Sequence, residues 1–154
     1  MNSLASSFPL NVRQKYAQKS IKPRSVIKLF SNDTNPPKNK LFIIIGQNEN
    51  QIGSLIVNSE INQKVHPVGS YFYSLQKQLD YFPTCQYLKH TSYADCTFIH
   101  EWKIEEITTI LTNIPERILG TLCEDHWRII IDTILTSKHI SVKKKKKFGL
   151  YSFQ

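Results

Sequence analysis

The apolar positions of this chain change their spacing near residue 102. Before that point they form short runs bounded by polar and turn-forming residues, as in β-strands. After it they recur every three or four residues, as on one face of an amphipathic helix. The pattern therefore predicts an α+β protein in which strands come first and helices follow.

The strongest strand pattern is a β-hairpin over residues 40–59. Residues 41–45 are apolar at every position, which predicts a central strand buried on both faces. A polar loop over 47–51 leads to a second apolar run over 52–59, so the two strands should pair antiparallel. In this hairpin we expect four side chains to be buried: Phe42, Ile44, Leu55 and Val57.

Shorter elements are predicted on either side of the hairpin. We expect strands at 25–30, around 86–90 and at 96–102, and an extended piece at 117–122. The region 60–90 contains two prolines and a glycine that interrupt any long element, which favours a winding connection there.

Two helices are predicted after residue 102. The first carries apolar residues at i, i+3 and i+7 and ends before Pro115. The second repeats at i, i+3, i+4, i+7 and i+8 from Trp127, with two carboxylates in its first turn, where the helix dipole favours them. Its buried face should hold Trp127, Ile130, Ile131 and Ile134, while Arg128 and Asp132 face water.

Length and composition limit the class of protein. A chain of 154 residues with 40% hydrophobic side chains suffices for one domain with a real core. The longest apolar run, 41–45, is far shorter than the roughly 20 residues that span a bilayer, so we expect no membrane partner. Three widely spaced cysteines indicate no disulfide framework and favour a cytoplasmic protein.

The net charge of +8 is concentrated at the two ends of the chain. We expect a flexible basic arm over 1–22, in which 12–19 could form a short helix. A single folded domain should cover 23–140, and a basic C-terminal tail should cover 141–154. Basic ends can bind a phosphate backbone without reading sequence, or simply keep the termini solvated.

The cysteines and histidines of residues 85–100 are candidates for two kinds of chemistry. Cys85, His90, Cys96 and His100 are ligand types that zinc accepts, but the closely spaced ligand pairs of zinc fingers are missing. Cys96 near a histidine could be a nucleophile, but no local signature supports it. Buried structural cysteines are the favoured interpretation, and neither a metal nor a cofactor is predicted.

Acid–base cleavage of RNA is a third possibility. It needs cations that stabilise a crowded phosphate, together with a proton acceptor and a donor. The residues that could supply them are Lys40, Lys89, His90, Ser92 and Asp95. Asp95 has an alternative role, because an aspartate beside a strand usually forms or caps a turn.

Segments 38–46, 53–59 and 92–96, with the helix from Glu124, resemble the PemK/Kid/MazF-like toxin superfamily. The resemblance implies a small SH3-like antiparallel β-barrel with a C-terminal helix. Together with the two helices predicted from spacing, we expect an SH3-like antiparallel β-barrel with two C-terminal helices as the barrel-plus-helix domain 23–140. Many members cut single-stranded RNA without metal, are silenced by an antitoxin protein, and tend to form homodimers.

The resemblance also implies residue roles. Lys40 or Lys38 would bind phosphate, Ser59 would supply the family's hydroxyl, and Asp95 its acid, whereas Tyr93 stands where the family has an arginine. The expected function is a metal-independent endoribonuclease toxin, or a degenerate relative. Its expected catalytic residues are Asp95, Ser59 and His90. Its expected RNA-binding residues are Lys38, Lys40, Lys89, Ser92, Lys143, Lys144 and Lys145. The alternative is a non-catalytic module that binds nucleic acid or protein through its basic ends.

Overall fold

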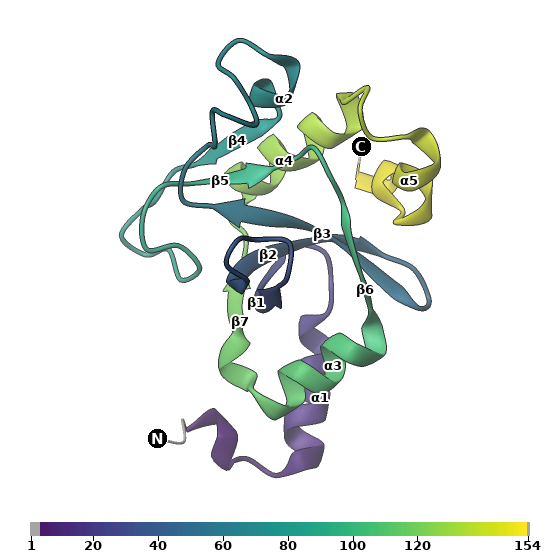
Figure 1. The fold of residues 1–154 in the computed structure, drawn as a ribbon. Coiled ribbons are helices and arrows are strands. Elements are labelled where there is room, and N and C mark those ends of the chain that lie inside the picture. Colours follow the sequence, from purple (N-terminus) through teal and green to yellow (C-terminus); the bar gives the residue numbers. More distant parts are fainter. Residues whose placement is uncertain (1–3, 154) are drawn as a thin grey trace.

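A long β-hairpin forms the middle of the molecule (Figure 1). In the computed structural model, which describes residues 4–153, β2 (Lys38–Gln47) and β3 (Gln51–Asn58) pair antiparallel, so the predicted hairpin is confirmed. The four side chains expected to be buried are all at most 7% exposed. Successive residues serve different cores: Ile43 lies in one apolar cluster and Ile44 in another. The hairpin is therefore buried on both faces, as its continuous apolar run predicts.

The hairpin belongs to one antiparallel sheet that curls like half of a barrel. The strand order is β4 (Gln76–Leu79), β5 (Ser92–Asp95), β3, β2, β1 (Ser25–Ser31) and β7 (Ile118–Thr121). A further strand, β6 (His100–Lys103), pairs with the beginning of β3. In the described part of the chain β4 and β7 do not pair with each other, so the sheet remains open.

Helices cover both faces of this sheet (Figure 1). On one side, α4 (Glu124–Thr136) buries Trp127, Ile130, Ile131 and Ile134 and leaves Arg128 and Asp132 exposed, as predicted. On the other side, α3 (Ile104–Asn113) packs with α1 (Leu10–Ser20), whose Ala17 is fully buried. The stretch expected to form a loose arm thus contains a packed helix.

Two strand predictions are corrected. Residues 86–90 form no strand, because Tyr87 and Leu88 insert into the core from an irregular segment instead of pairing with a neighbour. The strand expected at 96–102 begins only at His100, since the chain turns after Asp95. The strand predicted at 25–30 is confirmed as β1, and the extended piece predicted at 117–122 contains β7.

The C-terminal segment docks on the sheet. It comprises α5 (Val142–Lys147) and a 3-10 turn, η3 (Leu150–Phe153). Phe148 and Leu150 are essentially unexposed and belong to the core cluster on the α4 side. Phe148 lies against Gly53, where any Cβ atom would come within 2.9 Å of its ring.

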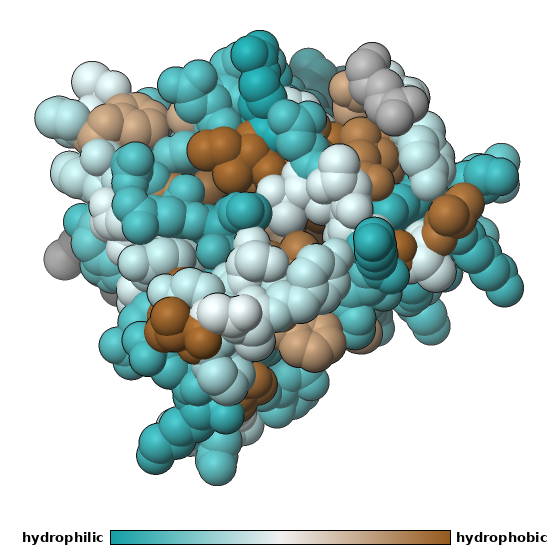
Figure 2. Space-filling view, turned by 90° about the horizontal axis from the view of Figure 1, so that it is seen from above, coloured by the Kyte–Doolittle hydropathy of each residue, from teal (hydrophilic) through white to brown (hydrophobic). Residues whose placement is uncertain are grey.

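Three short helices complete the fold: η1 (Ala5–Ser7), α2 (Tyr71–Ser74) and η2 (Pro115–Arg117). Seen from above in Figure 2, the surface is mainly hydrophilic, with apolar side chains exposed among polar ones. No helix within residues 4–153 is both long enough and apolar enough to cross a membrane.

Replacing Ile44 with alanine should lower the free energy of unfolding by about 2–5 kcal/mol, because the side chain is fully buried and the hairpin cannot collapse around the cavity. Chemical denaturation measures this loss. Phe30, which is 53% exposed on β1, provides the control: its alanine variant should lose less than about 1 kcal/mol. Equal losses for the two variants would show that the hairpin is not the centre of the core.

Candidate anion-binding site

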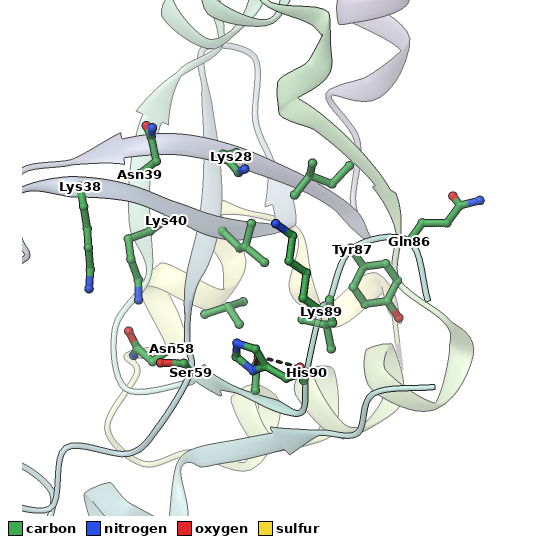
Figure 3. Close-up of a pocket in the computed structure, with 15 residues that line it drawn as sticks. Lys28, Lys38, Asn39, Lys40, Asn58, Ser59, Gln86, Tyr87, Lys89 and His90 are labelled. Carbon is green, nitrogen blue, oxygen red and sulfur yellow. Dashed lines mark hydrogen bonds between the residues drawn. The ribbon is translucent and has the colours of Figure 1, made fainter. Parts of the chain in front are cut away.

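A cavity of about 350 Å³ opens where the hairpin leaves the core (Figure 3). We call it the lysine pocket, because Lys28, Lys38, Lys40 and Lys89 all line it. Its other polar lining residues are Asn39, Asn58, Ser59, Gln86, Tyr87, His90 and Ser92. Six of the ten site residues inferred from sequence therefore line one cavity: Lys38, Lys40, Ser59, Lys89, His90 and Ser92.

The strand register explains how the pocket forms. Leu41 pairs with Val57, so continuing this register places Lys40 opposite Asn58, the last residue of β3. Lys38 therefore lies beyond the end of β3, so that at this position β2 is paired only with Ser31 of β1 on its other side. Figure 3 shows the side chains of Lys38 and Lys40 pointing the same way, toward Asn58 and Ser59, as alternation along a strand requires.

The opposite wall comes from the irregular segment that carries Lys89 and His90. Tyr87 anchors this segment: its hydroxyl accepts the Cys123 N–H at 3.0 Å and lies 2.8 Å from Nδ1 of His126. The hydroxyl can donate its proton to Nδ1 when the ring of His126 carries its own proton on Nε2. Burial raises the pKa of Tyr87, so this donor stays protonated.

The electrostatics of the pocket favour an anion. No carboxylate is found among the described residues that line it, whereas four ammonium groups are. Burial lowers the pKa of Lys40 from 10.5, and the neighbouring charge of Lys38 lowers it further. A bound anion would offset both effects, because it would restore a favourable partner to each ammonium group.

His90 has a defined local geometry. Its Nδ1 lies 3.0 Å from the Thr91 carbonyl and 3.4 Å from Oγ of Ser92, which itself donates to the His90 carbonyl at 3.0 Å. Since a carbonyl can only accept, Nδ1 carries the proton in this contact. In the neutral imidazole this leaves Nε2 as a proton acceptor.

Asp95 lies outside the pocket. It is three residues beyond Ser92 on β5, so its side chain points to the other face of the strand. Oδ1 accepts hydrogen bonds from Gln76 Nε2 at 2.8 Å, from the Thr97 N–H at 3.0 Å and from the Thr97 hydroxyl. This geometry is that of a turn cap, and it does not bring Asp95 together with Lys40, Ser59 or His90.

The lysines of the tail also lie away from the pocket. Lys145 is buried, and its Nζ donates to the carbonyls of Leu135 at 3.0 Å and Ser137 at 2.8 Å, where α4 ends. Lys144 forms an ion pair with Glu101, 2.7 Å away. Lys143 is exposed. The three side chains thus have different surroundings: one is buried, one is in an ion pair and one is exposed.

Sequence reasoning missed Lys28 and Asn58 as pocket residues. Lys28 lies on β1 opposite Leu41, and only the strand register places it beside the hairpin's free end. The signal for Asn58 was its position at the end of an apolar run, directly before Ser59.

Other chemistry has less support. The Cys96 thiol is buried, which raises its pKa to about 12, so little of the reactive thiolate forms near neutral pH. Within residues 4–153, no group of three or more His, Cys, Asp or Glu side chains could hold a metal ion. Comparison with protein-family models, curated proteins and solved structures gave no match.

Replacing Asp95 with alanine should lower the free energy of unfolding by about 1–3 kcal/mol, because Gln76 and Thr97 lose their shared acceptor. Asp95→Asn keeps an oxygen at this place and should cost less. Denaturation curves of both variants test the capping role. Neither variant should change the affinity for an anion, and a loss of affinity with intact stability would return Asp95 to the site.

The pKa of Lys40 should rise in a Lys38→Gln variant, because one of the two causes of its depression is removed. It should remain below 10.5, because burial persists. NMR titration of the lysine side-chain carbons measures the shift. In the wild-type protein, affinity for an anion should fall as the pH rises through this pKa. An unchanged Lys40 titration would show that the two ammonium groups do not interact.

Proposed function

We propose that this protein binds single-stranded RNA, holding the phosphate backbone in the lysine pocket. The observation that carries the proposal is the gathering of four lysines, without a carboxylate among the described lining residues, in one cavity. Phosphate contacts from lysine supply most of the affinity of sequence-independent binding. The pocket is assembled from β1, β2, β3 and the segment before β5, so the folded chain is required to bring these charges together.

The PemK/Kid/MazF-like resemblance and its SH3-like barrel belong to this proposal. Support comes from Lys38, Lys40 and Ser59, which the resemblance assigned to one site and which line one cavity. The open antiparallel half-barrel is compatible with a barrel that has widened at the seam between β4 and β7. On this proposal an antitoxin protein would be a natural partner, since it could block the pocket.

Salt dependence tests the binding. Lys40→Gln should weaken binding of single-stranded RNA and reduce the slope of log K against log salt by about 0.7 for one lost phosphate contact. Lys38→Gln should act similarly. Binding isotherms at several salt concentrations give these slopes.

Lys103→Gln is the matched control, because it removes the same charge at a distant place. Lys103 pairs with Gln51, at the other end of β3 from Asn58, about 24 Å away at the usual rise per residue. The control should leave the slope unchanged. Equal slopes for the wild type, the pocket variants and the control would refute binding through the lysine pocket.

RNA cleavage is a second candidate, favoured by the position of His90 in the same cavity as Lys40. Nε2 of a neutral His90 could accept the proton of a 2′-hydroxyl as the 2′-oxygen attacks the phosphorus, while Lys40 stabilises the charge that develops on the phosphate. The P–O5′ bond then breaks, and the departing 5′-oxygen takes a proton from water. This scheme replaces the expected role of Asp95, which caps a turn.

If cleavage occurs, His90→Gln should lower its rate by about 10²–10⁴-fold, because general acid–base catalysis contributes that much. RNA binding should persist in this variant, and Asp95→Asn should cleave at nearly the wild-type rate. Single-turnover assays on labelled RNA in EDTA measure the rates. Absence of cleavage by the wild-type protein, with binding intact, would leave the binding module as the function.

A further inference from the structure

The floor of the lysine pocket is apolar. Leu41, Val57, Leu88 and Leu119 line it, and all four belong to the core cluster on the α4 side or pack against it. The pocket is therefore the place where this core reaches the surface beneath a rim of ammonium groups. A site that served phosphate alone would need donors, whereas an apolar floor offers contact to a flat or hydrophobic group.

Two polar side chains in the wall of the pocket have no hydrogen-bond partner among residues 4–153. Asn58 and Ser59 lie side by side at the end of β3 (Figure 3), and neither side chain has a hydrogen bond within the described residues. An amide and a hydroxyl each offer both a donor and an acceptor. The edge of a nucleobase offers the same combination, whereas an acyl chain or a bare anion does not.

We propose that the lysine pocket takes one unstacked nucleotide of the single strand. Its base would lie on the apolar floor with its edge toward Asn58 and Ser59, and its flanking phosphates would contact Lys38, Lys40 and Lys89. The volume of about 350 Å³ falls within the range of small-ligand sites. This inference rests on the proposed RNA binding and adds that the pocket selects unpaired bases, because a base stacked in a duplex cannot reach the floor.

Two RNA ligands with equal numbers of phosphates distinguish binding of a base from binding of the phosphate backbone. The first is a random-sequence RNA octamer, and the second is an octamer of the same backbone in which every base is absent. At one salt concentration the abasic strand should bind at least about fivefold more weakly, the change expected from losing one net hydrogen bond at the base edge. Equal affinity for the two strands would overturn the inference and leave the proposed function standing. Failure of both strands to bind would contradict the proposed function itself.

Variants of the wall and floor make the assay specific. Asn58→Ala and Leu119→Ala should weaken binding of the normal octamer and leave binding of the abasic octamer unchanged. Leu119 is only half-buried on the edge strand β7, and thermal melting verifies that each variant is folded. Lys40→Gln should weaken both strands to a similar degree, because it removes a phosphate contact. If Asn58→Ala also weakened both strands equally, the base would not be the group that it contacts.

An amphiphilic anion is the competing occupant of such a pocket. Competition with a mixture of the four ribonucleoside monophosphates and, separately, with dodecyl phosphate distinguishes the two. The nucleotides should displace labelled octamer at lower concentration, because only they match Asn58 and Ser59. Displacement by dodecyl phosphate at the lower concentration would overturn the proposal.

Discussion

Burial of the β2–β3 hairpin on both faces is the constraint on which the rest of the structure depends. The apolar side chains on both faces of the hairpin are removed from water only if other elements of the chain cover each face. Helix α4 and the C-terminal segment cover one side, and helices α1 and α3 cover the other. Both clusters are therefore joined through the same two strands, so the positions of elements far apart in the chain are set by one sheet.

The lysine pocket lies where this constraint ends. The beginning of β2 extends past the end of β3, and there the continuous apolar run gives way to Lys38, Asn39 and Lys40. The strands still hold the backbone in a fixed direction, while the side chains are free of the packing that fills the centre. The paired strands hold the charged groups of the lysine pocket in position before a ligand arrives, which favours binding.

Much of the fold could be predicted because its signals are local. The run 41–45 and the spacing from Trp127 each reflect burial of the residues concerned. Tyr87 shows the limit: its segment resembles a strand in composition, yet its ring is buried by insertion and its hydroxyl binds Cys123 and His126, which lie far along the chain. Contacts with residues so far along the chain produce no recognisable pattern in the sequence around Tyr87.

The site was predictable in part for the same reason. Lys40 and Ser59 flank the two hairpin strands, so the hairpin pattern already implied that they are close. Asp95 lies outside the lysine pocket, and its position depends on strand parity and on where β5 stops, both of which shift when a boundary moves by a few residues. Predicting Lys28 as a pocket residue would have required knowing that β1 pairs with β2, and the sequence alone does not show this pairing.

The position of Phe148 near the C-terminus affects the order in which the core forms during synthesis. Its ring lies over Gly53 beside the side chain of Ile99, and it shares a core with Val26 from the other end of the chain. During synthesis the hairpin can pair early, since its strands are adjacent, but its α4 face keeps an open hollow until residues 148–150 have been made. Closing such a distant contact is slow relative to hairpin formation. The nascent protein therefore passes through a stage in which its central strands are formed and one apolar face is still exposed, a stage at which chaperones would have the most to bind.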